Sequence, residues 1–339
     1  MTPVDSTVSA AVNEAEILRH LSEFRTALRA IREELQRVIV GQETVLDGVL
    51  AALFLNGHVL LEGVPGLGKT LLVRTLGVAL GLKFNRIQFT PDLMPADIIG
   101  TRLVQQNAEG RMEFEFVPGP VFTHLLLGDE INRATPKTQS ALLEAMQERQ
   151  VTVAGVSMPL PRPFLVMATQ NPLEMEGTYP LPEAQLDRFL FKINVPFPDQ
   201  LELVEIGRRT TARQEPCARQ AIAEPQQGLP QWNALIRQIP VSKLILDFAA
   251  RMILATHRDH GSEIADKYIR YGASPRGLQA LILAGKYNAA VEGRATVSRT
   301  DIARWAVPCL QHRIILNFDA QSQDVSVEGV IEQTLRRLD

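Results

Sequence analysis

The sequence has only two cysteines, Cys217 and Cys309, which lie far apart, and neither is part of a Cys-x-x-Cys pair. The spacing therefore offers neither a disulfide framework nor a zinc site. We expect both thiols to be buried or chemically idle.

Long apolar runs and a strong charge of one sign are also missing from the 339 residues. The longest apolar stretches, such as residues 49–55, are far too short to span a bilayer, and residues 1–12 lack the pattern of an export signal. The formal net charge of -3, with both signs interspersed, creates no large positive field for nucleic acid or anionic lipid. We therefore expect a cytoplasmic protein with no membrane span and no nucleic-acid partner.

The sequence does contain a glycine-rich stretch at residues 63–70, Gly-Val-Pro-Gly-Leu-Gly-Lys-Thr. An apolar run precedes it and a helical pattern follows, which is the context of a phosphate-binding loop. Glycines let the backbone aim its N–H groups at a polyphosphate at the positive end of a helix. Lys69 would reach the β- and γ-phosphates, and the Thr70 hydroxyl would bind Mg²⁺. The predicted nucleotide contacts of this stretch are Gly63, Pro65, Gly66, Leu67, Gly68, Lys69, Thr70 and Leu71.

Two further polar groups follow apolar strands. The run 125–127 leads to Asp129 and Glu130. In a nucleotide-hydrolysing site Asp129 would hold Mg²⁺ through its water shell, and Glu130 would activate the attacking water as general base. A solvated turn is the alternative for such a pair, and the phosphate loop upstream favours the first interpretation. The run 164–168 leads to Asn171, which could orient the attacking water or cap a turn.

An apolar patch at residues 38–40 ends at a glycine just before the next helical segment. Val40 and Gly41 are our candidates for the adenine pocket. A packed turn between two helices explains the patch equally well.

The remaining pattern predicts an α/β domain followed by helices. Strands are also expected at residues 84–89 and 189–195, in addition to those near the site. Alternating side chains predict a hairpin over residues 103–116, inserted in a helix or placed at the edge of the main sheet, with its turn at 107–110. A second hairpin is expected over residues 151–158.

A polar stretch at residues 210–230 indicates a domain boundary, and long apolar stripes after it predict helices. We expect an N-terminal helical extension (1–29), an α/β core (30–211) and an all-helical second domain (231–339). In the last domain, Arg276 follows a serine cap and a proline in the first helical turn, where it opposes the helix dipole and indicates an anionic partner. The expected helices of this domain are 242–258, 274–292, 298–316 and 325–338.

Together these motifs resemble the AAA+ ATPases, and more closely the MoxR family. The resemblance covers nearly the whole chain from residue 38 onward. It rests on residues 63–70, 88–100, 129–134, 138–148, 168–172, 176–189 and 272–276. One departure is Gly128, which stands before the acidic pair where a larger apolar residue is common.

The resemblance implies an AAA+ core with a parallel five-stranded sheet, inserted hairpins and a helical lid, assembled into a homo-oligomeric ring, usually a hexamer. It implies ATP and Mg²⁺ as cofactors, with Asn171 as first sensor and Arg276 as second sensor. Arg188 matches the arginine finger best, although Arg133 and Arg149 are alternatives. On the residues alone, Arg188 would instead form a surface ion pair with Asp187.

Members of this family are thought to be chaperone-like ATPases that remodel, assemble or activate partner proteins, often ones with a von Willebrand factor A domain. Other functions stay open on the sequence. They are an ATPase motor subunit of a metal-chelatase-like or DNA-linked complex, and a nucleotide-gated scaffold with little turnover. The modest net charge gives no support to a DNA-linked role.

Overall fold

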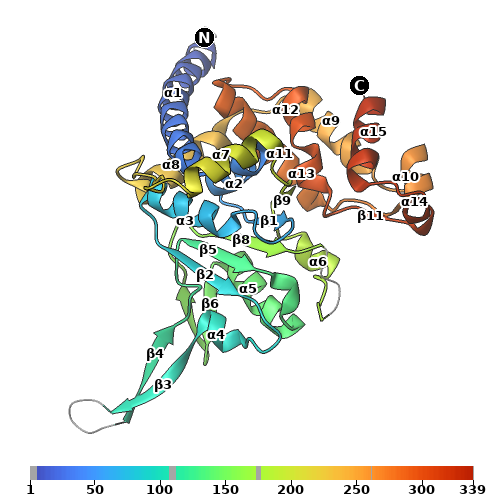
Figure 1. Ribbon diagram of the computed structural model, residues 1–339. Coiled ribbons are helices and arrows are strands. Elements are labelled where there is room, and N and C mark those ends of the chain that lie inside the picture. Colours follow the sequence, from blue (N-terminus) through green and yellow to red (C-terminus); the bar gives the residue numbers. More distant parts are fainter. Residues whose placement is uncertain (1–5, 107–111, 173–176, 261, 339) are drawn as a thin grey trace. The chain divides into compact units, whose positions relative to one another are not determined.

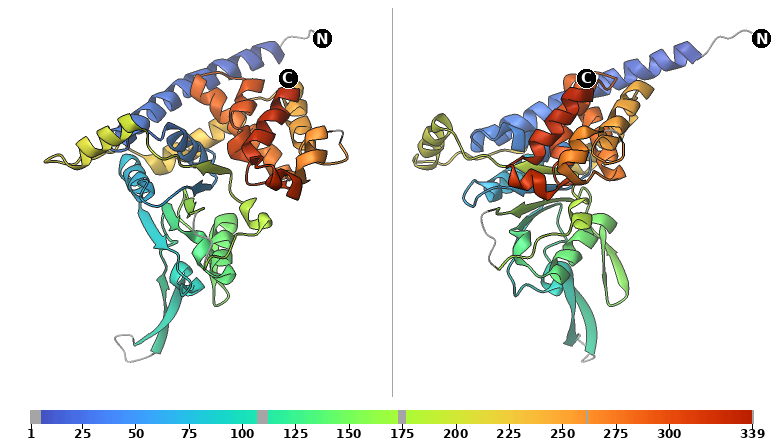
Figure 2. Two further views of the ribbon diagram at one scale, coloured as in Figure 1. Left: turned by 45° about the vertical axis from the view of Figure 1, so that its right-hand side comes forward. Right: turned by 90° about the vertical axis from the view of Figure 1, so that its right-hand side faces the viewer.

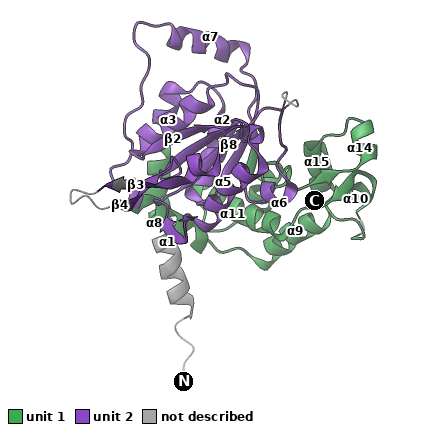
Figure 3. Ribbon diagram, turned by 90° about the horizontal axis from the view of Figure 1, so that it is seen from below, with its two compact units in different colours: residues 1–30, 190–192, 227–339 green, residues 31–189, 193–226 purple. Residues whose placement is uncertain are grey.

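The computed structural model describes residues 6–106, 112–172, 177–260 and 262–338. Contacts between residues divide the chain into two compact units. Unit 1 comprises residues 1–30, 190–192 and 227–339, and unit 2 comprises residues 31–189 and 193–226 (Figure 3). The domain limits expected from the sequence stay a prediction.

A five-stranded sheet with the strand order β2-β5-β8-β1-β9 organises unit 2 (Figure 1). β1 pairs with β8, β8 with β5 and β5 with β2, all in parallel, as the fold class predicted from the sequence requires. The apolar runs form β1, β5 and β8 because their side chains are buried on both faces, whereas only Ile87 is buried in β2. The strands are β1 (Val59–Glu62), β2 (Phe84–Gln88), β5 (Leu125–Asp129), β8 (Leu165–Gln170) and β9 (Phe191–Asn194).

Helices connect the strands of unit 2. The long helix α1 (Ser6–Val38) belongs to unit 1 up to Ala30 and to unit 2 from Ile31, and α5 begins at Pro136, because proline is favoured at the first helical position. The others are α2 (Glu43–Phe54), α3 (Lys69–Leu80), α4 (Pro95–Ile99), α5 (Pro136–Glu148), α6 (Glu183–Leu186), α7 (Gln200–Thr210) and a short 3-10 turn η1 (Ile131–Arg133).

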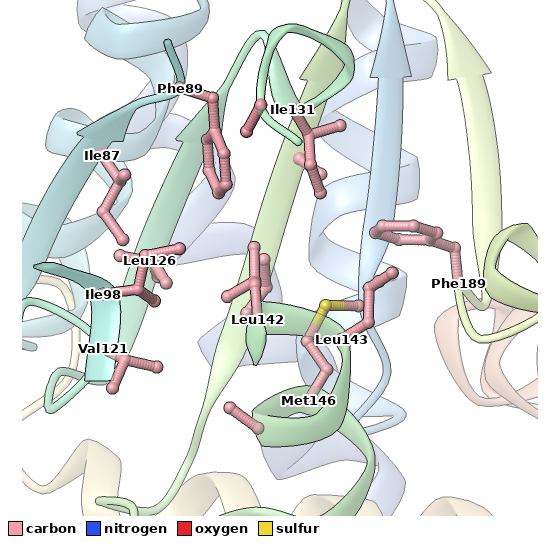
Figure 4. Close-up of a cluster of buried hydrophobic side chains, with 14 of the residues drawn as sticks. Ile87, Phe89, Ile98, Val121, Leu126, Ile131, Leu142, Leu143, Met146 and Phe189 are labelled. Atoms are coloured by element: carbon pink, nitrogen blue, oxygen red, sulfur yellow. The ribbon is translucent and has the colours of Figure 1, made fainter. Parts of the chain in front are cut away.

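A hydrophobic cluster fixes α5 against one face of the sheet (Figure 4). Leu142, from α5, and Phe89, which follows β2, are fully buried in it. This packing accounts for Gly128, because a Cβ there would lie 3.2 Å from the Phe89 ring and 3.4 Å from Leu142. A larger side chain at position 128 would displace the ring, so the glycine leaves room for Phe89.

Both predicted hairpins are present, each as its own two-stranded sheet. They are β3 (Gly100–Gln106) with β4 (Met112–Pro118), and β6 (Gln150–Val153) with β7 (Val156–Pro159). The first is therefore not an edge of the main sheet, and it projects away from that sheet (Figures 1 and 2). It follows α4, a helix of only 5 residues, and its predicted turn at 107–110 lies outside the described residues.

Unit 1 is mainly helical, with α8 (Pro225–Gln238), α9 (Lys243–Leu254), α10 (Glu263–Tyr268), α11 (Pro275–Glu292), α12 (Arg299–Arg304), α13 (Ala306–Leu310), α14 (Phe318–Ser322) and α15 (Val327–Leu338). Helix α8 begins inside the polar stretch that the sequence assigned to the boundary. An antiparallel pair, β10 (Ile269–Tyr271) with β11 (Ile315–Leu316), interrupts the expected all-helical order.

The predicted helix 298–316 is wrong as a single element. It is divided into α12, α13 and β11. Pro308 supplies the reason, because in a continuous helix its ring would clash with the carbonyl of Arg304, the residue at which α12 ends.

Candidate functional site

The glycine-rich loop connects β1 to α3 as predicted. Gly66 and Gly68 have φ values of 86° and 74°, the left-handed region in which a side chain is strained. No atom lies within 4 Å of the position that a Cβ would take at either glycine, so the loop faces open space. Exposed loop backbone at the N-terminus of a 12-residue helix is suited to bind an anion. The loop thus has the geometry that a polyphosphate requires.

Lys69, the first residue of α3, folds back over this loop. Its Nζ donates a hydrogen bond of 2.5 Å to the carbonyl oxygen of Gly63. Burial is the largest influence on this ammonium and lowers its pKa, while the carboxylates of Asp129, Glu130 and Glu62 act in the opposite direction. The lysine is therefore held at the loop, in the field of three acidic side chains.

The acidic pair lies at the carboxyl end of β5, and Thr169 of the neighbouring strand β8 connects its two members. The Thr169 hydroxyl donates to Asp129 Oδ1 over 2.6 Å and accepts from the Glu130 backbone N–H over 2.9 Å. Glu130 has a φ of 57°, an unusual value for a residue that is not glycine. The buried Thr169 thus helps to fix the backbone turn between Asp129 and Glu130.

Two residues of β2 hold the same pair from the other side. Gln88 Nε2 donates to Glu130 Oε2 over 2.7 Å, and Arg86 Nη2 lies 2.7 Å from Asp129 Oδ2. Arg133 also forms an ion pair with Glu130, with 3.1 Å between Nε and Oε2. Each carboxylate therefore has positive or amide donors from this chain alone.

These groups surround a cavity of about 250 Å³. It is lined by the glycine-rich loop, including Lys69 and Thr70, by Asp129 and Glu130, and by Asn171, which follows β8. The structure therefore brings the predicted phosphate, metal and water-activating residues together. Asp129 and the Thr70 hydroxyl line the same cavity and provide the oxygen donors that Mg²⁺ prefers. The loop offers room for phosphates, so the residues present fit both Mg²⁺ and a nucleotide.

A second cavity of about 490 Å³ adjoins the same loop, with Gly66, Leu67 and Gly68 lining both. The predicted patch 38–40 and Leu71 line it, whereas Gly41 is not among its lining residues. From α7, Arg209 Nη1 donates to the carbonyl oxygens of Gln36 and Arg37 at the end of α1, over 2.8 and 2.9 Å, which ties the patch to α7. An apolar cavity beside a phosphate loop suits a nucleobase.

The predicted arginines lie in different surroundings. Arg188 follows α6, is half-buried, and donates from Nη1 to the Leu143 carbonyl over 2.9 Å; it does not line the phosphate cavity. Arg149 donates to the side-chain and backbone oxygens of Asn56. Arg276 is exposed in the first turn of α11 in unit 1, with its backbone N–H capped by Ser274.

Arg86, Gln88 and Thr169 are site residues that the sequence motifs did not reveal. One signal was available, because Arg86 and Gln88 flank the buried Ile87 and thus share one face of β2. What the local pattern cannot provide is the strand order that places β2 beside β5.

Three further features are the cysteines, possible metal-binding clusters and possible membrane-spanning helices. Cys309 is buried and Cys217 exposed, both as free thiols, and no acid, histidine and cysteine cluster suited to a metal was found within the described ranges. Over the same residues, none of the helices has the length and apolar character needed to cross a bilayer.

Comparisons with known proteins agree with this geometry. A family model described as "ATPase family associated with various cellular activities (AAA)" matches residues 58–191, and a model of the AAA lid domain matches residues 261–334. A crystal structure from Cytophaga hutchinsonii, of a protein assigned as an ATPase, has a TM-score of 0.87 and 39% identity and covers 99% of each chain. The fold and the site define an AAA ATPase.

The sequence relatives narrow this class. Chaperone MoxR1 of Mycobacterium tuberculosis is 45% identical over 317 residues, which is 93% of this chain and 82% of the relative. Protein MoxR of Methylorubrum extorquens is 30% identical over 329 residues, with 87% and 90% covered. The chain belongs to the MoxR family of AAA ATPases, and the expected family is confirmed.

Proposed function

We propose that this protein binds ATP with Mg²⁺ and hydrolyses it in a chaperone-like homo-oligomeric ring that remodels, assembles or activates a partner protein. The observation that supports the chemistry is the convergence of Lys69, Thr70, Asp129 and Glu130 on one cavity. The adjoining apolar cavity supports the adenine base, with Val40 as a contact and Gly41 beside it.

Each residue has a distinct role in this proposal. Lys69 and the loop N–H groups bind the phosphates, and Asp129 with Thr70 would hold Mg²⁺, which when bound supplies positive charge to the β- and γ-phosphate oxygens. Glu130 accepts a proton from the attacking water, and Asn171 orients that water. Arg276 and Arg188 would neutralise charge that develops on the transferred phosphoryl group, Arg188 on the neighbouring subunit's nucleotide.

The relative named a chaperone supports a protein client, and its name does not specify one. A client with a von Willebrand factor A domain and a hexameric ring are part of the proposal. A nucleotide-gated scaffold is the competing function, and it predicts binding with little turnover.

Two substitutions test the chemistry. Lys69→Ala should lose nucleotide binding, whereas Glu130→Gln should bind ATP normally and lose about 10²- to 10⁴-fold in turnover, the usual contribution of a general base. Binding is measured by anisotropy of a fluorescent ATP analogue and turnover by phosphate release. Normal turnover in Glu130→Gln would refute the assignment of the base, and negligible turnover in the unmodified ring would favour the scaffold.

A further inference from the structure

Arg86 is a charged residue of the phosphate cavity to which no role has been assigned so far. It extends from β2, and its guanidinium contacts the side chain of Asp129 twice, with 2.7 Å from Nη2 and 3.3 Å from Nε to Oδ2. The same Nη2 donates to Gln88 Oε1 over 2.5 Å. Because Gln88 in turn donates to Glu130, one guanidinium supports the positions of both acidic side chains.

The ion pair of Arg86 engages Asp129, the carboxylate that is the predicted metal ligand. Thr169 engages Asp129 Oδ1, and Arg86 engages Oδ2, so both oxygens have donors in this arrangement. Mg²⁺ held by Asp129 through its water shell would carry a charge of the same sign as the guanidinium of Arg86, and the two cations would repel each other at close range. Arg86 and Mg²⁺ would therefore compete for the negative charge of Asp129.

The charges in the cavity support this view. Among its described lining residues the ionisable side chains are Lys69, Arg86, Asp129 and Glu130, two of each sign. Without Arg86, Asp129 would face the nucleotide phosphates with Lys69 as the remaining cationic lining residue, since Arg133 pairs with Glu130. Repulsion between Asp129 and the phosphates would then weaken nucleotide binding whenever no metal is present.

We propose that Arg86 is a positioning residue that substitutes for the charge of Mg²⁺ at Asp129 in the metal-free protein, and thereby limits how strongly nucleotide affinity depends on the metal. This inference rests on the proposed function, because it assumes that the cavity binds ATP. Arg86 gives the metal-free site an affinity for ATP. When the metal binds, the ion pair between Arg86 and Asp129 is broken and Asp129 becomes available to Mg²⁺.

The coupling between metal and nucleotide is the quantity that this proposal changes. It is measured as the ratio of the ATP dissociation constants in EDTA and in saturating Mg²⁺, and linkage requires that the same factor describes the effect of ATP on Mg²⁺ affinity. In Arg86→Gln the metal-free affinity should fall while the affinity with Mg²⁺ changes little. The ratio should rise about two- to fivefold, the range for an ion pair whose arginine is 44% exposed.

The second arm of the test follows the metal directly. At fixed ATP analogue, Arg86→Gln should reach half-maximal binding at a lower Mg²⁺ concentration than the unmodified protein, because no guanidinium competes for Asp129. Arg86→Lys, which keeps the charge but lacks the planar fork that reaches Asp129 and Gln88 together, should lie between the two. Arg74→Gln is the matched control, since Arg74 is an exposed residue of α3 that does not line the cavity.

The outcomes separate this inference from the proposed function. If the unmodified protein does not bind the ATP analogue with Mg²⁺, the proposed function fails. If it binds and the coupling ratio of Arg86→Gln is unchanged or lower, only the role of Arg86 is refuted. A residue that merely stabilises the fold would weaken both affinities by the same factor and leave the ratio constant. Circular dichroism verifies folding, and should Arg86→Gln not fold, Arg86→Lys and the Mg²⁺ titration decide the question.

Discussion

At the scale of single residues, the site depends on side chains that connect neighbouring strands. Thr169 is an example, because its hydroxyl both donates to Asp129 and accepts from the backbone of Glu130. The hydrogen bond that the Glu130 N–H donates joins neutral groups and contributes roughly 0.5–1.5 kcal/mol, which offsets part of the cost of the left-handed conformation of Glu130. The position of Glu130, the proposed base, thus depends on a residue of the neighbouring strand β8.

His58 connects β1 with α5 in a similar way and gives a prediction about pH. Its Nδ1 accepts from the Val166 N–H over 3.0 Å and its Nε2 donates to the Met146 carbonyl over 3.1 Å, so the ring is neutral. Burial, together with the positive charge of Arg149, lowers the pKa of His58 to about 3. Since the unfolded chain takes up a proton below its ordinary pKa of about 6.5, stability should be lost as pH falls from there toward 3.

Removing this proton uptake should make the fold less sensitive to acid. Between pH 7.5 and 5.5 the unmodified protein should lose about 1.4 kcal/mol more than His58→Gln, whatever the starting stability of the variant. Urea unfolding followed by circular dichroism at both pH values measures the two changes. Equal losses in the two proteins would mean that His58 does not remain neutral in the folded state.

At the scale of elements, the β3–β4 hairpin is the clearest case of a segment separate from the site. Met112 and Phe114 are 74% and 73% exposed, and the hairpin forms its own sheet. The ring of Phe116 instead packs against Phe122, with 5.6 Å between centroids, which anchors the base of the hairpin. The outer part can therefore be removed without disturbing that anchor.

Arg102 and Phe116 are register partners, so a short Gly-Ser turn can join them and replace residues 103–115. We expect this variant to bind nucleotide within about twofold of the unmodified protein, because none of the described residues of this segment lines either cavity and loop shortening costs little. Anisotropy of a fluorescent ATP analogue measures the affinity. A loss of more than tenfold would show that the hairpin supports the nucleotide site.

The helices and strands also show which parts of the fold could be predicted from the sequence. Apolar runs predicted the strands that carry the loop and the acidic pair, because a buried strand needs apolar side chains on both faces. The break at Pro308 was missed because the apolar stripe continues on both sides of it. The contacts of Arg86 and Gln88 were missed for another reason, since they depend on β2 lying beside β5, a neighbour that is not next in sequence.

At the scale of the whole molecule, the role of Arg188 depends on assembly. In its own chain it donates to the Leu143 carbonyl and does not line the phosphate cavity. An arginine finger is worth about 10³-fold or more in turnover. We therefore expect Arg188→Ala to bind ATP and to lose most hydrolysis.

Mixing two inactive variants tests action between subunits. When Arg188→Ala and Glu130→Gln are mixed evenly, about a quarter of the interfaces combine an intact base with an intact finger, so a corresponding part of the activity should return. The control is Arg188→Ala mixed with the Arg188→Ala/Glu130→Gln double variant, which forms no such interface. Sedimentation with ATP establishes co-assembly. Co-assembled rings without recovered turnover would exclude Arg188 and direct attention to Arg133 or Arg149.

The balance of charge around the phosphate cavity also bears on kinetics. With Lys69 and Arg86 offsetting Asp129 and Glu130, and a net charge of -3 over the chain, no long-range field draws a polyanion toward the loop. Nucleotide should therefore arrive by unassisted diffusion, at a rate that ionic strength changes little. The affinity for the nucleotide should then depend mainly on how slowly it dissociates. The short-range hydrogen bonds of the loop determine that rate.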